Sequence, residues 1–124
     1  MAESREKSPQ TRWLPSSPPV EAGQFEDVIG GAMVIVHFWA PWNPYDKQLD
    51  ANLQQVRKKF PRLQFYSANT DETAFTPIVE RFNVAALPAL VCFTRSRTQG
   101  RFHGVETLQA LEAFLTEMSQ SASR

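Results

Sequence analysis

Apolar positions along the chain follow two different spacings. Nearly continuous apolar runs predict strands, and runs that recur every three or four residues predict amphipathic helices. The expected strands are residues 33–38, 63–68, 89–93 and 101–103, and the expected helices are 24–29, 47–60, 75–82 and 108–118. Within the 75–82 stripe, Thr76 before Pro77 predicts an N-cap followed by a first-turn proline.

The two ends of the chain differ from this pattern. Residues 1–19 are rich in Ser, Pro and charge, so we expect them to be mostly disordered. Trp13 and Leu14 are the exception, and they predict a short edge strand near residues 12–15. Residues 119–124 are expected to be a disordered polar tail. One folded domain is therefore expected over residues 20–118.

The order of these elements is β-α-β-α-β-α-β-β-α. Strands that alternate with helices predict an α/β three-layer sandwich with a parallel centre. The last two strands are close enough in sequence to form an antiparallel hairpin, which makes the central sheet mixed.

Charge and cysteine content narrow the function classes. The 124 residues carry 13 basic and 13 acidic side chains, so no strong field attracts nucleic acid or an anionic membrane. The first ten residues lack the apolar core of a secretory signal, and the one cysteine allows no internal disulfide. We therefore expect a cytoplasmic or nuclear monomer with neither cofactor nor metal.

Three short motifs resemble the thioredoxin family. Residues 39–42 (Trp-Ala-Pro-Trp) follow a strand, as the same four residues do before the family's Cys-Gly-Pro-Cys. Leu87-Pro88 resembles the family's cis-proline loop, and Gly104 resembles its closing glycine. The resemblance spans residues 20–118 and implies the thioredoxin fold with a cis peptide bond before Pro88.

A narrower resemblance links the chain to the N-terminal thioredoxin-like domain of PICOT-type multidomain monothiol glutaredoxins. It rests on residues 22–26 and 36–42. PICOT-type domains carry His at the position of His37, whereas typical thioredoxins carry a buried Asp near this position. It implies a non-reducing docking domain in a system that handles glutathione-ligated iron–sulfur clusters. Because this chain has no cluster-ligating cysteine, a link to clusters would require glutaredoxin or iron–sulfur protein partners.

The thioredoxin cysteine positions hold Asn43 and Asp46. Disulfide exchange needs thiols, and neither an amide nor a carboxylate forms a mixed disulfide. Asn43 and Pro44 instead suit the cap and first turn of a helix, with Asp46 near its positive end. Either this segment is a well-capped helix start, or it forms a recognition surface.

An aromatic docking face is the recognition alternative. Trp42 and Tyr45 flank the motif, and Leu87 and Pro88 should lie beside it. In thioredoxins this region binds extended peptides, and exposed aromatics carry much interface energy. The simpler interpretation is that Trp39 and Trp42 only support the fold.

The remaining candidate groups have structural interpretations. Cys92 lies in an apolar strand and is expected to be a buried small hydrophobe, with a reactive lone thiol as the alternative. His37 is expected to be a half-buried core histidine beneath the motif loop. A metal site shared with His103 is disfavoured, since no cysteine or clear carboxylate accompanies the pair.

Three functions are therefore compared. The leading hypothesis is a redox-inactive thioredoxin-like module that docks proteins and is not an enzyme. The second is an atypical oxidoreductase that uses Cys92 with glutathione. The third is a cysteine-free adaptor or chaperone cofactor that acts through its N-terminal segment.

Overall fold

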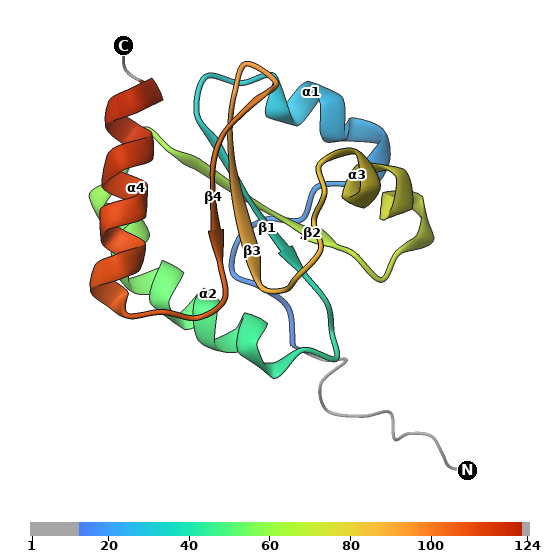
Figure 1. Ribbon diagram of the computed structural model, residues 1–124, viewed down its shortest axis with the longest axis horizontal. Coiled ribbons are helices and arrows are strands. Elements are labelled where there is room, and N and C mark those ends of the chain that lie inside the picture. The colour runs from blue at the N-terminus through green and yellow to red at the C-terminus, as the bar shows by residue number, and fades with distance from the viewer. Residues whose placement is uncertain (1–12, 123–124) are drawn as a thin grey trace.

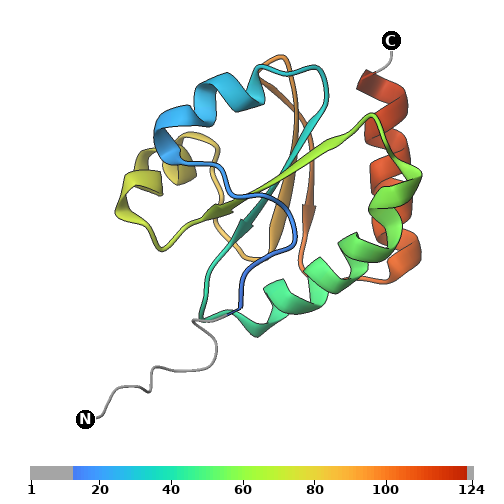
Figure 2. The same ribbon diagram turned by 180° about the vertical axis from the view of Figure 1, so that it is seen from behind.

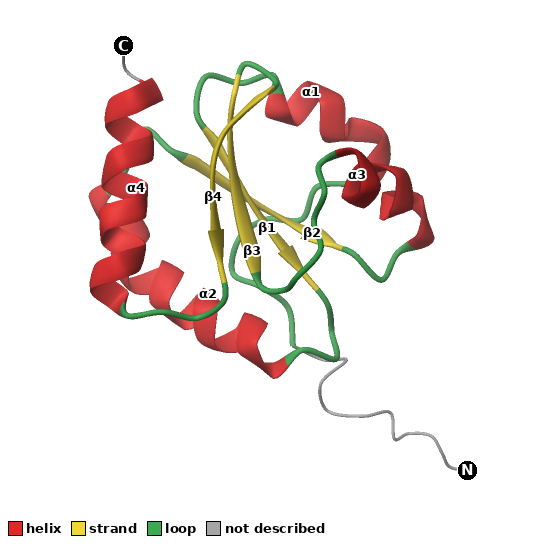
Figure 3. Cartoon of the chain, in the orientation of Figure 1, coloured by secondary structure: helices red, strands yellow, loops and turns green. Residues whose placement is uncertain are grey.

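A mixed sheet lies at the centre of the molecule, with helices on both faces (Figure 1). The computed structural model describes residues 13–122, and within them the sheet has four strands in the order β2-β1-β3-β4. The strands are β1 (Val34–Trp39), β2 (Gln64–Asn69), β3 (Ala89–Thr94) and β4 (Arg97–His103). The helices are α1 (Phe25–Ile29), α2 (Pro44–Val56), α3 (Thr76–Arg81) and α4 (Leu108–Ala122) (Figure 3). Short 3₁₀ turns precede α1 and α3 and follow α2.

Strand register determines which residues meet at the functional end of the sheet. β1 runs parallel to β2 and antiparallel to β3, and β3 pairs antiparallel with β4. Phe38 lies opposite Ala89, so the last residues of β1 and the first residues of β3 lie at the same end of the sheet. The segment after Trp39 therefore emerges beside Pro88.

The core has two halves, one on each face of the sheet. Val34, Val36 and Phe38 pack on the face that α1 and α3 cover, together with Phe25 and Phe75. The other face, covered by α2 and α4, is packed by a second set of residues that includes Ile35, Leu49, Leu53, Leu90, Cys92, Leu111 and Leu115. This alternation along β1 is the period-two pattern of a strand buried on both sides.

The N-terminal region differs from the expectation. The predicted edge strand near residues 12–15 is wrong for residues 13–15, which form no strand, and residue 12 lies outside the described part of the chain. An isolated bridge joins Pro19 to Ser67 of β2 instead, with Ser67 N–H donating to Pro18 O and Val20 N–H to Ser67 O. Two nearby prolines cannot donate to a ladder, which explains why the pairing stops there. We call residues 13–20 the N-terminal strap (Figure 2).

Three other boundaries also differ. α4 continues to Ala122, past the tail expected from Ser119, because polar Ser and Gln residues extend its exposed side. β4 begins at Arg97, since its first residues are polar edge-strand positions that the apolar pattern does not mark. Thr76 is the first residue of α3 and makes no cap, because a 3₁₀ turn runs directly into the helix.

Candidate functional site

The start of α2 is a capped helix terminus, as its residues predict. The Asn43 side chain accepts a hydrogen bond from the backbone N–H of Tyr45 at 2.9 Å, and Pro44 occupies the first turn. Asn43 N–H donates to Ala40 O at 3.1 Å, which closes the loop between β1 and α2. Residues 40–46 therefore form a fixed turn rather than a loose loop.

Asp46 plays a different role from the expected one at the helix dipole. Its side chain is fully buried, and Oδ1 lies 2.9 Å from Nε2 of His37 on β1. Its Oδ2 accepts a hydrogen bond from Ala40 N–H at 3.1 Å. The carboxylate is thus used to join the end of β1, the motif turn and α2, and it is withdrawn from the surface.

His37 is buried more deeply than the half-buried position expected. It is 1% exposed, and its second ring nitrogen, Nδ1, has no hydrogen-bond partner within residues 13–122. A buried imidazole bonded to one carboxylate is a strong local constraint, because either partner alone would be an unpaired buried polar group.

His37 and His103 project from opposite faces of the sheet. His37 lies opposite Leu90, which lies opposite Phe102, so the neighbouring His103 faces the other way. No group of three or more metal-ligating side chains is gathered within residues 13–122.

Aromatic side chains cover the outside of this turn. Trp42 is 62% exposed and Tyr45 is 56% exposed, although both flank the buried Asp46. The indole Nε1–H of Trp42 donates to Asp71 Oδ1 at 2.9 Å, which ties the ring to the loop after β2. Trp39, by contrast, is 5% exposed and belongs to the fold, with Trp13 of the strap packed edge-on at 5.4 Å.

The loop before β3 completes this end of the sheet. The Leu87–Pro88 peptide bond is cis, Pro88 is buried and Leu87 is half-buried. Gly104 N–H donates to Pro88 O at 2.9 Å and holds the loop against the end of β4. We name Trp42, Tyr45 and Pro88 the motif face.

Cys92 is remote from solvent. It is fully buried in β3, and burial raises the pKa of its thiol to about 11. The thiolate, which is the nucleophilic form, is therefore scarce near neutral pH.

A second buried carboxylate was missed by the sequence analysis. Asp50 is 1% exposed and lies one turn after Asp46, where it accepts hydrogen bonds from Ser16 of the strap. Asp46, Leu49, Asp50 and Leu53 follow the i, i+3, i+4, i+7 spacing of the buried face. That spacing is the signal that could have placed both carboxylates inside the protein.

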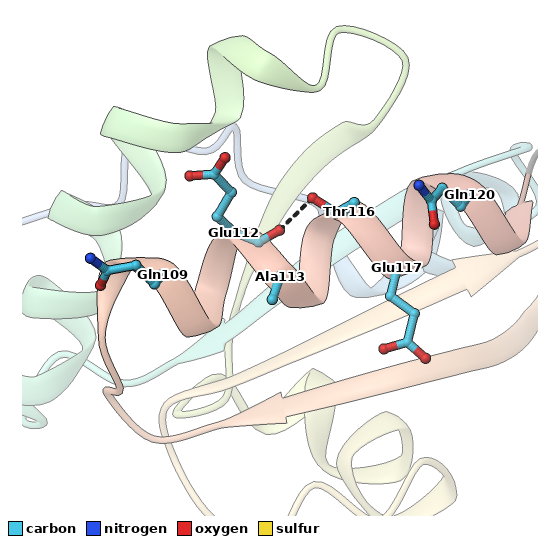
Figure 4. Close-up of a pocket in the computed structure, with 6 residues that line it drawn as sticks. All are labelled: Gln109, Glu112, Ala113, Thr116, Glu117 and Gln120. Atoms are coloured by element: carbon cyan, nitrogen blue, oxygen red, sulfur yellow. Dashed lines mark hydrogen bonds between the residues drawn. The ribbon is translucent and has the colours of Figure 1, made fainter.

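A shallow hollow lies away from the motif face, along the outer side of α4. Figure 4 shows the six residues that line it, which are Gln109, Glu112, Ala113, Thr116, Glu117 and Gln120. They are mostly exposed polar side chains of one helix, and none belongs to the motif face. The arrangement has no converging groups that would fix a ligand.

The sheet order, the cis-proline loop and the Trp-Ala-Pro-Trp turn define a thioredoxin-fold domain with an altered motif. The chain belongs to the thioredoxin family, whose sequence model matches residues 17–117. Solved thioredoxins superimpose well. That of Malassezia sympodialis gives a TM-score of 0.74 at 24% identity over 87% of this chain and 96% of that one. Mitochondrial thioredoxin 3 of Saccharomyces cerevisiae gives 0.72 at 21% identity, over 89% and 99%.

Monothiol glutaredoxins are among the curated relatives. Human glutaredoxin-3 is 27% identical over 86 residues, which cover 67% of this chain and 25% of that protein. Monothiol glutaredoxin-S17 of Arabidopsis thaliana is 34% identical over 76 residues, covering 61% and 15%. The chain thus spans a quarter or less of these two relatives and is related to the N-terminal region of glutaredoxin-3.

Within residues 13–122, no helix has the length and apolar character needed to cross a bilayer. The sequence has one cysteine where many relatives of this fold are oxidoreductases, which is compatible with the absence of dithiol chemistry.

Proposed function

We propose that this domain is a redox-inactive docking module that binds proteins through its motif face. The observation that carries the proposal is the exposure of Trp42 and Tyr45, at 62% and 56%, on the turn that the buried Asp46 anchors to His37 and Ala40. Large aromatics are costly to leave in water and are the residues that most often anchor interfaces.

The motif chemistry supports a binding role over a catalytic one. A carboxylate and an amide stand at the two thiol positions, and the carboxylate is engaged by His37 and Ala40. The remaining thiol, Cys92, is buried with a raised pKa, which weighs against a glutathione-linked activity.

The proposed partners are proteins of the glutaredoxin and iron–sulfur system. The support is the similarity to human glutaredoxin-3 and to monothiol glutaredoxin-S17. We further propose that the domain acts in the cytoplasm or nucleus, binds no nucleic acid or membrane, and is a monomer when free. Its zero formal net charge supports the exclusion of polyanions.

Affinity capture from native lysate tests this function. The tagged wild type is compared with Trp42→Ala/Tyr45→Ala, and captured proteins are quantified by mass spectrometry. A Gln109→Ala/Gln120→Ala variant on the outer side of α4 is the matched control. We expect glutaredoxins or iron–sulfur proteins to be enriched by the wild type and control and lost with the aromatic variant. Equal capture by all three would remove the motif face as the docking surface.

A further inference from the structure

Polar contacts hold the strap to the domain, and they converge on Ser16. Ser16 N–H lies 3.1 Å and 3.0 Å from the two carboxylate oxygens of Asp50, and Ser16 Oγ–H donates to Oδ1 at 3.0 Å. The guanidinium of Arg57 donates to both Ser16 Oγ and Ser17 Oγ. We call Ser16, Asp50 and Arg57 the strap latch.

The two serines of the latch differ in access. Ser17 is 1% exposed, and its carbonyl oxygen accepts a hydrogen bond from Ser67 Oγ at 2.9 Å. Ser16 is exposed, although its hydroxyl touches the buried Asp50 carboxylate. Ser16 is therefore an exposed residue whose hydroxyl contacts both a buried carboxylate and a guanidinium.

We propose that Ser16 is a phosphorylation site and that its phosphorylation releases the strap from α2 and β2. The reaction is transfer of the terminal phosphoryl group of a nucleoside triphosphate by a protein kinase. The Ser16 Oγ–P bond forms, the bond between that phosphorus and the bridging oxygen breaks, and the nucleoside diphosphate leaves. The hydroxyl proton passes to the kinase's base. The inference does not depend on the proposed docking function.

Loss of the hydroxyl proton and the added negative charge both weaken the contact between Ser16 and Asp50. The phosphorylated oxygen can no longer donate to Asp50, and the new group carries about −1.5 to −2 charges beside that carboxylate. Arg57 supplies a single positive charge to the latch. Its guanidinium also lies over the Phe65 ring of β2, at 6.0 Å from the ring centroid. The latch then holds more negative than positive charge in a site where Asp50 is 1% exposed.

Release of the strap uncovers the free edge of β2. The bonds from Ser67 N–H to Pro18 O and from Val20 N–H to Ser67 O are the strap's backbone pairing with that strand. An unpaired strand edge is a surface on which another extended chain can pair. Release also removes Trp13 from Trp39, next to the motif face.

Hydrogen exchange on protein carrying genetically encoded phosphoserine at position 16 tests the release. The amide protons of Val20 and Ser67 report the strap–β2 pairing. We expect both to exchange about tenfold faster or more than in the unmodified protein, because local opening controls their rates. Phosphoserine in place of Gln120, on the outer side of α4, adds the same charge elsewhere and should leave both amides unchanged.

The Asp50→Asn variant distinguishes repulsion between the phosphate and the Asp50 carboxylate from simple loss of the hydrogen bond between Ser16 Oγ and Asp50. Without the carboxylate, Arg57 can hold the phosphate, so phosphoserine at position 16 should restore slow exchange relative to unphosphorylated Asp50→Asn. Unchanged exchange at Val20 and Ser67 with phosphoserine 16 in the wild-type background would overturn the proposal. So would equal acceleration in both backgrounds.

Phosphopeptide mapping of the protein isolated from its own cells under phosphatase inhibition tests whether the site is used. Phosphate on Ser16 is expected. A peptide covering residues 13–20 with no phosphate, or with phosphate on Ser17 alone, would overturn the assignment.

Discussion

At the residue scale, Asp46 links the altered motif to the fold. Its two oxygens engage His37 Nε2 and Ala40 N–H, at 2.9 Å and 3.1 Å, inside a fully buried site. A residue at the position that holds a cysteine in thioredoxins is thus part of the buried scaffold in this chain. The Trp42 ring is held separately, by the hydrogen bond from its indole N–H to Asp71.

Replacing Asp46 by Ala should destabilise the protein strongly. The change leaves His37 Nε2 and Ala40 N–H unpaired in the interior, and each unsatisfied buried polar group costs roughly 1–3 kcal/mol. Urea denaturation measures the free energy of unfolding of the variant and of the wild type. Glu106→Ala, at an exposed loop position, is the control and should stay within about 0.5 kcal/mol of the wild type. An Asp46→Ala loss as small as the control's would show that the pair contributes little.

The Cys92 thiol should be unreactive in the folded protein. Burial raises its pKa to about 11, from an ordinary value of 9.0. A thiol-reactive dye at pH 8 should label it only after unfolding in urea. Rapid labelling of the native protein would contradict the buried placement.

The same raised pKa predicts a loss of stability in alkali. Between about pH 9 and 11 the unfolded thiol has lost its proton while the native thiol keeps it, so the unfolded state is favoured as pH rises. The slope attributable to Cys92 is at most about 1.4 kcal/mol per pH unit. The Cys92→Ala variant should lack this slope. Free energies of unfolding of the wild type and the variant, measured across this pH range, make the comparison.

At the element scale, α2 carries most of the site. Its cap residue closes the motif turn, its first turn presents Tyr45, and its inner face holds Asp46 and Asp50. The second carboxylate anchors the strap, so one helix connects the motif face to the N-terminal segment. A change at the start of this helix should therefore affect both.

Loss of the Asn43 cap should destabilise α2 by an amount typical of caps. Asn43→Ala removes the acceptor for Tyr45 N–H, and such changes cost about 0.5–2 kcal/mol. Asn43→Ser keeps an acceptor oxygen and should recover most of the loss. Thermal or urea unfolding of the two variants makes the comparison. Equal stability of both would mean that loss of the cap hydrogen bond does not cause the destabilisation.

At the scale of the whole molecule, the fold could be predicted from sequence because its signals are local. The apolar strand of residues 34–38, the Trp-Ala-Pro-Trp turn and Leu87-Pro88 each have a short-range pattern, and the mixed sheet and the thioredoxin fold are confirmed. The strap could not be predicted in the same way. Ser16 and Asp50 are 34 positions apart, and a Ser/Pro-rich composition does not reveal a long-range polar contact.

The site could be predicted in part. The residue types predicted Asn43 at the cap, which the structure shows. The sequence left open whether Trp42 belongs to a docking face or supports the fold, and it did not reveal that Asp46 pairs with His37. That pair joins a strand to a helix through side chains nine positions apart, so it depends on how the two elements pack. Hydrophobic periodicity alone carries little information about such polar contacts across a core.

Hydroxyl-radical footprinting of the free domain and of its captured complex tests whether partners dock on the motif face. Trp42 and Tyr45 are exposed in the free protein, so both should be oxidised readily. We expect the partner to protect Trp42 and Tyr45 and to leave the residues on the outer side of α4 as reactive as before. Unchanged oxidation of Trp42 and Tyr45 in the complex, with protection elsewhere, would contradict docking through the motif face.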